Sequence, residues 1–167
     1  MASAATMPSG MAICCSIPDM LFLPELVFGG LVWILVACTY VNPANPQGYV
    51  MAVSLFCFCL SFIWMMVFLC GSHNNKSSWA AADVLYHGLA AILYLSASVL
   101  LALVTIGWGN LNAVLGGVLN FLGTSQNADI DILKIYRLDI SAVVFSFITT
   151  LLYTIHTIFS GIRWKSF

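Results

Sequence analysis

Four ionisable side chains lie inside or at the edge of strongly apolar stretches of this sequence: Glu25, Asp83, His87 and His156. A charged side chain at the centre of a membrane costs about 3 kcal/mol on insertion scales, so such residues normally pair inside a bundle or mark a path for ions. Asp83 and His87 are spaced i, i+4, which suits an ion pair or two metal ligands on one helix face. Two ligands are too few for a metal site, and the sequence shows no third one nearby. We therefore interpret the pair as structural and predict neither a metal nor another cofactor.

Motifs for catalysis are missing from the sequence. It contains no nucleophile motif, no glycine-rich phosphate loop and no paired-carboxylate pattern. A lone histidine such as His156 is more typical of a hydrogen-bonded core residue than of a catalyst. The net charge of −1 gives no basic patch for nucleic acid. We therefore expect a protein that is not an enzyme and does not bind nucleic acid.

The composition identifies the environment of these residues. The 167 residues are 62% hydrophobic and 7% charged, whereas a soluble domain has about 25% charged residues. Four apolar runs are each long enough to cross roughly 30 Å of hydrocarbon. The sequence predicts an all-α integral membrane protein, a four-helix transmembrane bundle with spans at about 20–41, 50–70, 84–106 and 140–162. Residues 1–18 are expected to be disordered, residues 19–163 to form the four-span domain, and residues 164–167 to form a short tail.

The connections between the spans differ in length. The first, "NPANPQG", suits a tight turn between antiparallel neighbours. The third is long, from residue 107 to residue 139, and part of it has helical spacing of apolar side chains. The pattern is consistent with a short helix on the membrane surface or with an irregular apolar loop, and involves Leu111, Val114, Leu115, Val118, Leu119 and Leu122.

Basic residues indicate the orientation by a narrow margin. Four spans put both termini on one side of the membrane, and Lys and Arg favour the cytosol. Three basic residues lie on the side of the termini and two on the other side: Lys76, Arg163 and Lys165 against Lys134 and Arg137. Cytosolic termini would also place the glycosylation sequence Asn75-Lys76-Ser77 in the cytosol, where it stays unmodified.

The alternating direction of the spans predicts that the ionisable residues meet. Glu25 and His156 both lie roughly 9 Å inside the same membrane face, and His87 about 4–5 Å. We predict a buried polar latch in which Glu25 contacts His87 or His156 and Asp83 lies at the edge, so that spans one, three and four dock in one way. The contact can be an ion pair or a neutral hydrogen bond. In the alternative, Glu25 reaches back to the membrane surface.

Two further features concern packing and acylation. Small and hydroxyl side chains form a stripe on the fourth span that predicts close contact with a neighbouring helix; its members are Ser146, Thr150, Thr154, Thr157 and Gly161. Cys14 and Cys15 lie just before the first span, a position where cysteines can be palmitoylated. Cys70 is a second, weaker candidate.

Several runs resemble a known family. They are "ELVFGGLVWILVA" (Glu25–Ala37), "QGYVMAVSLFCF" (Gln47–Phe58), "LYHGLAAILYLSASVL" (Leu85–Leu100) and "AVVFSFITTLLYTIHTIFSGIRWKS" (Ala142–Ser166). They are similar to the myelin and lymphocyte protein (MAL) family of MARVEL-domain tetraspan proteolipids. The resemblance implies cytosolic termini, association with cholesterol- and sphingolipid-rich membrane, and roles in vesicle trafficking, apical transport and myelin-type membrane. It also implies a trafficking signal at Arg163, Trp164, Lys165 and Ser166. The third connection is longer here than in the familiar members.

These observations favour a non-enzymatic organiser of lipid-rich membrane domains and transport vesicles. Its expected partners are cholesterol, sphingolipids, membrane protein cargo and further copies of itself, at the plasma membrane and in vesicles. The alternative is a channel or carrier subunit that uses the intramembrane Glu and His residues. Against this alternative, we expect nothing polar to continue to the other leaflet.

Overall fold

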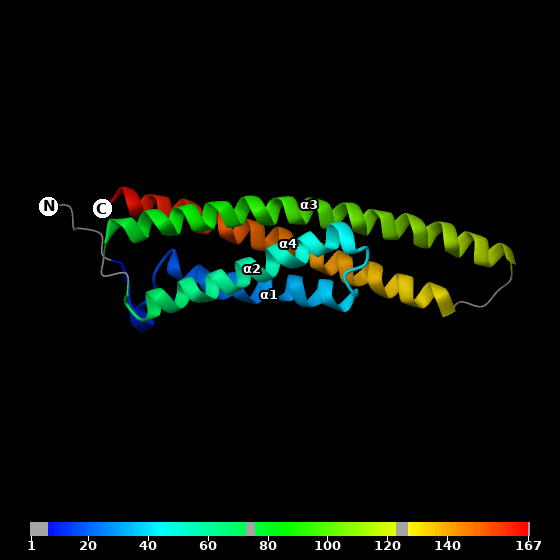
Figure 1. The fold of residues 1–167 in the computed structure, drawn as a ribbon, viewed down its shortest axis with the longest axis horizontal. Coiled ribbons are helices and arrows are strands. Elements are labelled where there is room, and N and C mark those ends of the chain that lie inside the picture. Colours follow the sequence, from blue (N-terminus) through cyan, green and yellow to red (C-terminus); the bar gives the residue numbers. More distant parts are fainter. Residues whose placement is uncertain (1–6, 73–75, 123–126, 167) are drawn as a thin grey trace.

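The computed structural model describes residues 7–72, 76–122 and 127–166, which form an antiparallel bundle of four long helices. They are α1 (Phe22–Cys38), α2 (Ala44–Leu69), α3 (Ser77–Leu122) and α4 (Asn127–Lys165), preceded by the short 3₁₀ helices η1 (Gly10–Cys15) and η2 (Asp19–Leu21). Four helical segments are long and apolar enough to cross a membrane, and the first of them consists of η2 and α1 together. η1 and the C-terminal end of α4 lie at the same end of the bundle (Figure 1), which we call the terminal end. The predicted all-α four-helix membrane fold is confirmed.

Prolines determine where α1 and α2 begin. Pro24 lies in the first turn of α1, where a missing N–H removes no helical hydrogen bond. Asn45 has an extended backbone (φ −123°, ψ 120°) because the ring of Pro46 disfavours helical geometry in the residue before it. The regular part of α2 therefore starts within the "NPANPQG" segment, earlier than the span start predicted at residue 50.

The third connection is helical almost throughout, which corrects the prediction of a separate surface helix or loop. α3 continues without a break from the membrane span to Leu122, and its 46 residues extend for roughly 69 Å. No proline interrupts residues 107–122, and each glycine there costs only about 1 kcal/mol. Gly109 also packs against Tyr136 of α4, since a Cβ at that glycine would lie 3.1 Å from the ring. α3 and α4 thus extend as a hairpin beyond the α1–α2 connection (Figure 1).

The N-terminal segment from residue 7 is ordered, in contrast to the disorder expected through residue 18. Met7 and Ile13 are buried with Phe22, Phe68 and Ala80 at the terminal end of the bundle. These side chains cover apolar surface where α1 and α3 begin and α2 ends. Their burial offsets the entropy lost when the segment is ordered.

The packed face of α4 repeats every 3.5 residues. Its members alternate steps of four and three along the helix, the spacing of a left-handed helical supercoil. All are fully buried or nearly so: Ala142, Ser146, Thr149, Tyr153, His156, Ser160 and Arg163. The side chains near the middle of the bundle pack in the main apolar core with Val32, Val36, Val50, Ala90, Tyr94, Ala97 and Leu101. This face therefore determines which residues of α4 meet the other three helices.

The predicted hydroxyl stripe follows this face over only half of its length. Ser146 and Thr150 are buried, but Thr154 is exposed and Gly161 has no atom within 4 Å of the position of a Cβ. The stripe advances by more than 3.6 residues per turn and the packed face by 3.5, so the two lines diverge along the helix. Thr157 packs against α3, since its Cγ2 lies 3.6 Å from the position of a Cβ at Gly88, whereas Thr154 is exposed, and the prediction is wrong for the interhelical role of Thr154.

Because the two lines diverge, substitution by leucine is expected to destabilise the protein at Thr150 and to have no effect at Thr154, one turn further along α4. Thr150→Leu places extra volume against Ser98, whose hydroxyl lies 3.3 Å from that of Thr150. We expect it to lower the free energy of unfolding by about 1–3 kcal/mol, a typical cost of overpacking. Thr154→Leu, the matched control, faces outward and should leave the unfolding temperature in detergent unchanged. Equal effects of the two substitutions would contradict the assigned face.

Candidate functional site

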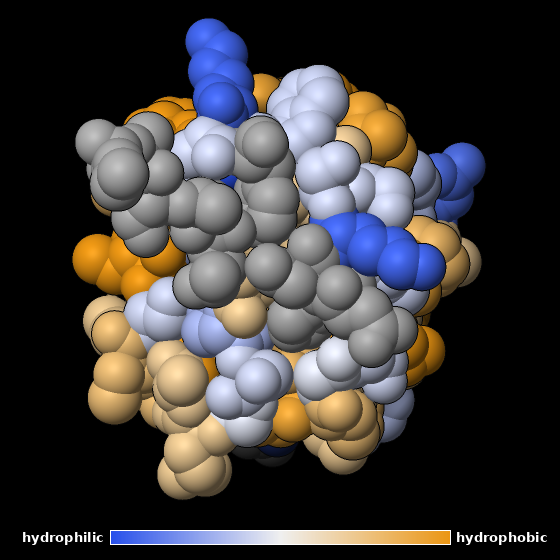
Figure 2. Space-filling model, turned by 90° about the vertical axis from the view of Figure 1, so that its left-hand side faces the viewer, coloured by the Kyte–Doolittle hydropathy of each residue, from blue (hydrophilic) through white to orange (hydrophobic). Residues whose placement is uncertain are grey.

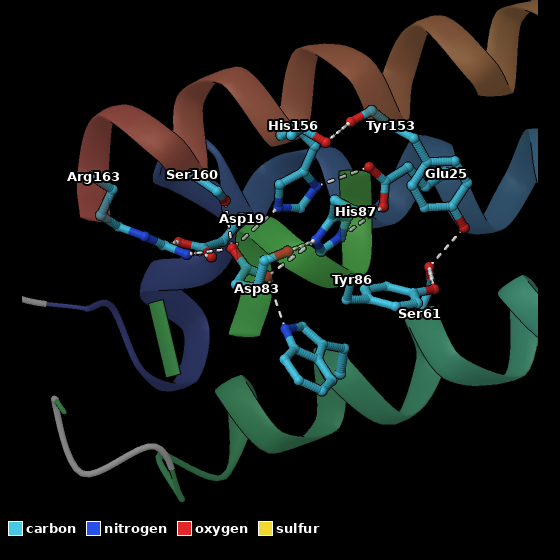
Figure 3. Close-up of polar contacts among 12 residues, drawn as sticks. Asp19, Glu25, Ser61, Asp83, Tyr86, His87, Tyr153, His156, Ser160 and Arg163 are labelled. Carbon is cyan, nitrogen blue, oxygen red and sulfur yellow. Dashed lines mark hydrogen bonds and ion pairs between the residues drawn. The ribbon is translucent and has the colours of Figure 1, made fainter. Parts of the chain in front are cut away.

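Glu25 is the centre of a buried polar cluster at the terminal end of the bundle (Figure 3). Its side chain leaves the first turn of α1 and is 1% exposed. Oε1 lies 2.8 Å from Nδ1 of His156 on α4, and Oε2 lies 3.5 Å from Nε2 of His87 on α3. The structure thus places Glu25 in contact with both histidines and not at the membrane surface.

The two histidines are held by aromatic packing. Their rings are stacked, with centroids 3.6 Å apart and an interplanar angle of 21°. Phe22 packs against both, at 5.3 Å from His87 and 4.8 Å from His156. Tyr86 contacts the edge of His87 at 4.7 Å. The apolar surroundings exclude water from the imidazole rings, so their polar partners must come from the protein.

Asp83, on α3, connects this contact to α2 and α4. Its Oδ1 accepts a hydrogen bond from Trp64 of α2 at 2.8 Å and lies 3.2 Å from Nδ1 of His87. Its Oδ2 accepts from Ser160 and, at 2.8 Å, from Arg163 of α4. The same oxygen lies 3.9 Å from Nε2 of His156. Asp83 is therefore more than the edge of the predicted latch, because it contacts both histidines from the side away from Glu25.

Arg163 and Asp19 are members of the cluster that the sequence analysis missed. Arg163 Nη1 donates to both carboxylate oxygens of Asp19, at 2.8 and 2.7 Å, and Nη2 donates to Asp83. The Arg163 side chain is only 9% exposed. The resemblance placed Arg163 in a C-terminal trafficking signal, but its side chain contacts Asp19 and Asp83 inside the bundle. The 3.5-residue spacing from His156 through Ser160 was the signal that could have identified it.

The charges of the cluster do not balance when both histidines are neutral. The cluster contains three fully buried carboxylates, those of Asp19, Glu25 and Asp83, but only one guanidinium, which pairs with Asp19 and Asp83. Two negative charges are then in excess. Protonation of both rings would balance them, but two positive charges 3.6 Å apart repel by roughly 5 kcal/mol at an effective dielectric constant of about 20. With both rings neutral, the cluster is a negative site.

A hydroxyl network extends the cluster toward the middle of the bundle. Ser61 of α2 is hydrogen-bonded to Tyr86 at 2.8 Å and to Tyr153 at 2.7 Å. Tyr86 also donates to the carbonyl of Cys57. The network links α2, α3 and α4 one turn further into the membrane.

Buried polar contacts also occur beside the α1–α2 connection, at the other end of the region where all four helices pack. They correct the expectation that nothing polar reaches the other leaflet. Gln47 of α2 donates to both carboxylate oxygens of Asp139 on α4, at 3.0 and 2.9 Å. Thr39, just after α1, lies 2.8 Å from the amide oxygen of Gln47. All three side chains are fully buried. The sequence analysis missed this contact because Gln47 and Asp139 fell in or beside predicted connections.

The other predicted site residues lie outside the cluster. Cys14 and Cys15 are exposed in the last turn of η1, and Cys70 is exposed just after α2. Trp164, Lys165 and Ser166 are exposed at the end of α4. Asn75 lies outside the described residues. The arrangement of the cluster suits the holding of helices or of a cation: Glu25, His87 and His156 each present a ligand atom within 4.8 Å of the other two.

A buried cluster of this kind predicts a large effect from a single deletion. Glu25→Ala leaves two buried histidines without their shared acceptor, and breaking a buried ion pair typically costs about 3–5 kcal/mol. We expect a much lower unfolding temperature in detergent and poor delivery to the cell surface. Leu23→Ala is the matched control, since Leu23 lies in the same turn of α1 but is 48% exposed. A Glu25→Ala protein as stable as this control would end the latch hypothesis.

Comparisons with known proteins agree with this architecture. The chain matches the MARVEL family model, a membrane-associating domain, over residues 13–159. The myelin and lymphocyte proteins of Canis lupus familiaris and Homo sapiens are 43% and 44% identical to it over 162 residues, covering 97% of this chain and 94% of each relative. Plasmolipin of Danio rerio is 30% identical over 155 residues, covering 90% of this chain and 73% of the relative. No solved structure matches the chain. The chain is therefore a multi-pass membrane proteolipid that belongs to the MARVEL-domain family, in the group of the myelin and lymphocyte proteins.

Proposed function

We propose that this protein is a non-enzymatic organiser of cholesterol- and sphingolipid-rich membrane domains and of the vesicles that carry them. The observation that carries the proposal is that ionisable side chains are buried between the helices, whereas the outer surface of the bundle is apolar. Charged groups contact one another between the helices, whereas large apolar side chains such as Val27, Phe56, Leu89, Leu103 and Leu151 are exposed around it. Figure 2 shows hydrophobic residues around the sides and hydrophilic ones on the terminal face. Such a surface contacts lipid tails and offers no reaction centre.

Hydrophobic mismatch supplies a mechanism for lipid selection. A helix whose apolar length differs from the bilayer thickness costs fractions of a kcal/mol per Å of mismatch. The span within α3 is 43 residues long and the one within α4 is 34, well beyond the roughly 20 residues that a bilayer requires. A stiff bundle with these two helices favours thicker, ordered membrane. Because the preference of one molecule is small, we propose that the protein acts as a homo-oligomer and carries membrane protein cargo with it.

The C-terminus fits a sorting role in part. The resemblance assigned a signal to residues 163–166, yet Arg163 is engaged with Asp19 and Asp83. Trp164, Lys165 and Ser166 are exposed and remain available to a cytosolic partner. We propose that the signal is read from these three residues, at the plasma membrane and on transport vesicles, while Arg163 holds the end of α4 against the bundle.

A channel or carrier subunit is the second candidate, favoured by one observation. Buried polar groups lie at both ends of the bundle, at Glu25 and at the Gln47–Asp139 contact, with the Ser61 network in between. Ion conductance of the purified protein in planar bilayers, abolished by Asp139→Asn, would support this function over that of an organiser.

The main proposal predicts partitioning into ordered lipid. In giant vesicles that separate into ordered and disordered phases, the tagged protein should concentrate in the ordered phase. Cholesterol depletion of the same vesicles should remove the preference, since the ordered phase is then thinner and more fluid. Equal partitioning before and after depletion would falsify the proposed lipid selection.

Orientation can be tested at opposite ends of the molecule. Cytosolic termini predict that Asn75 stays unglycosylated and that the tip of the α3–α4 hairpin faces the lumen. Asp129→Thr completes a glycosylation sequence with Asn127 at that tip. We expect a glycosidase-sensitive mobility shift for Asp129→Thr and none for the unaltered chain. A shift in the unaltered chain that disappears in Asn75→Gln would reverse the topology.

Acylation is expected at the exposed N-terminal cysteines. Cys14 and Cys15 lie on the terminal side of the bundle, where cytosolic palmitoylation would reach them. Acyl-biotin exchange on Cys14→Ser/Cys15→Ser should lose most of the signal. Cys38→Ser is the matched control, because Cys38 is exposed at the other end of α1 and should contribute none. An unchanged signal in the double variant would move the assignment to Cys70.

A further inference from the structure

We propose that Glu25, His87 and His156 form a binding site for one divalent transition-metal ion of the zinc class, held between α1, α3 and α4. Two imidazoles and one carboxylate are a ligand set that zinc accepts, with a fourth position for water. The sequence alone offered only Asp83 and His87 on one helix. The bundle adds a histidine from α4 and a glutamate from α1, with one ligand atom of each residue within 4.8 Å of the others.

The first argument is that both imidazole rings direct a nitrogen at the carboxylate of Glu25 while buried polar atoms of the cluster lack hydrogen-bond partners. Within the described part of the chain, Glu25 Oε2, His87 Nε2 and His156 Nε2 are buried and lack a hydrogen-bond partner. Oε2 of Glu25 and Nε2 of His87 face each other at 3.5 Å, longer than a hydrogen bond. Nδ1 of His156 faces the other oxygen of the same carboxylate at 2.8 Å. Both rings thus direct a nitrogen at Glu25, and these two nitrogens are the ligands we assign.

The second argument is the position of Asp83. Histidines that bind a metal normally bond a carboxylate or a carbonyl through their other nitrogen, which orients the ring. His87 Nδ1 lies 3.2 Å from Oδ1 of Asp83 and 2.8 Å from the Asp83 carbonyl. His156 Nε2 lies 3.9 Å from Oδ2 of Asp83. One carboxylate therefore stands behind both rings, in the place that a metal site requires, and Ser160, Trp64 and Arg163 fix it there.

The third argument is charge. With neutral histidines the cluster of Asp19, Glu25, Asp83 and Arg163 holds two excess negative charges. A divalent cation between Glu25 and the rings neutralises both and keeps the histidines in the neutral form that binds metal. Ligands about 2.0–2.2 Å from one ion are closer together than 4.8 Å, so the stacked rings turn apart as their nitrogens converge on it.

The test is metal content and ligand type in the purified full-length protein. The chain is purified in detergent through a tag without histidines, stripped with a chelator and titrated with Zn²⁺ against a competing chelator. We expect one ion per chain. Glu25→Gln, His87→Gln and His156→Gln should abolish this binding, and Asp83→Asn should weaken it by about 10–100-fold. Asp139→Asn, a buried carboxylate at the other end, is the matched control and should bind as the unaltered protein does.

X-ray absorption of the zinc-loaded, unaltered protein decides the ligands even where a variant fails to fold. Nitrogen and oxygen neighbours at about 2.0–2.1 Å, with histidine scattering, are expected. Sulfur neighbours at about 2.3 Å would assign the ion to the free cysteines and overturn the proposal. So would binding of less than one ion per chain, or stoichiometric binding that persists in Glu25→Gln.

Discussion

The structure depends on the neutralisation of charge inside a membrane. Asp19, Glu25 and Asp83 are buried where water cannot solvate them, and each contacts a basic or imidazole side chain of another helix. An unpaired charge in such a place is costly, and pairing requires atoms to meet within about 4 Å. That requirement is more specific than apolar packing, because lipid tails and leucine side chains are nearly interchangeable partners. The cluster therefore determines how the terminal ends of α1, α3 and α4 dock.

The remaining structure supports this arrangement. The packed face of α4 repeats every 3.5 residues and contributes His156, Ser160 and Arg163 to the cluster on the same line that carries Ala142 and Ser146 into the core. The contact between Gln47 and Asp139 joins α2 to α4 at the far end, so that both ends of the bundle are held by buried polar bonds. These contacts support the proposed response to bilayer thickness, which requires a bundle that keeps its length.

The same constraint connects the two roles we propose. A membrane organiser needs only a stable bundle with an apolar exterior, and paired charges provide it. The stacked histidines leave that pairing incomplete, because Glu25 and both rings retain buried atoms without hydrogen bonds. A bound cation would complete the pairing and strengthen the docking of α1, α3 and α4. Lipid selection would remain a property of the outer surface and of helix length.

The sequence by itself determined the membrane class, the number of spans and the depth at which Glu25 meets the histidines, since apolar length and a rise of 1.5 Å per residue suffice for these. It did not determine the extent of α3 or the ends of α2, where glycine and proline act only with the packing around them. It also could not show which residues of α4 face inward. The packed face repeats every 3.5 residues and the predicted hydroxyl stripe every 3.75, and these two lines diverge over several turns. The spacing of α4 could place Arg163 on the packed face, but the partners of Arg163, Asp19 and Gln47 were decided by tertiary structure. The ion pairs of Arg163 with Asp19 and Asp83 and the contact of Gln47 with Asp139 join residues 80 or more positions apart in the sequence, and only the folded bundle brings them together.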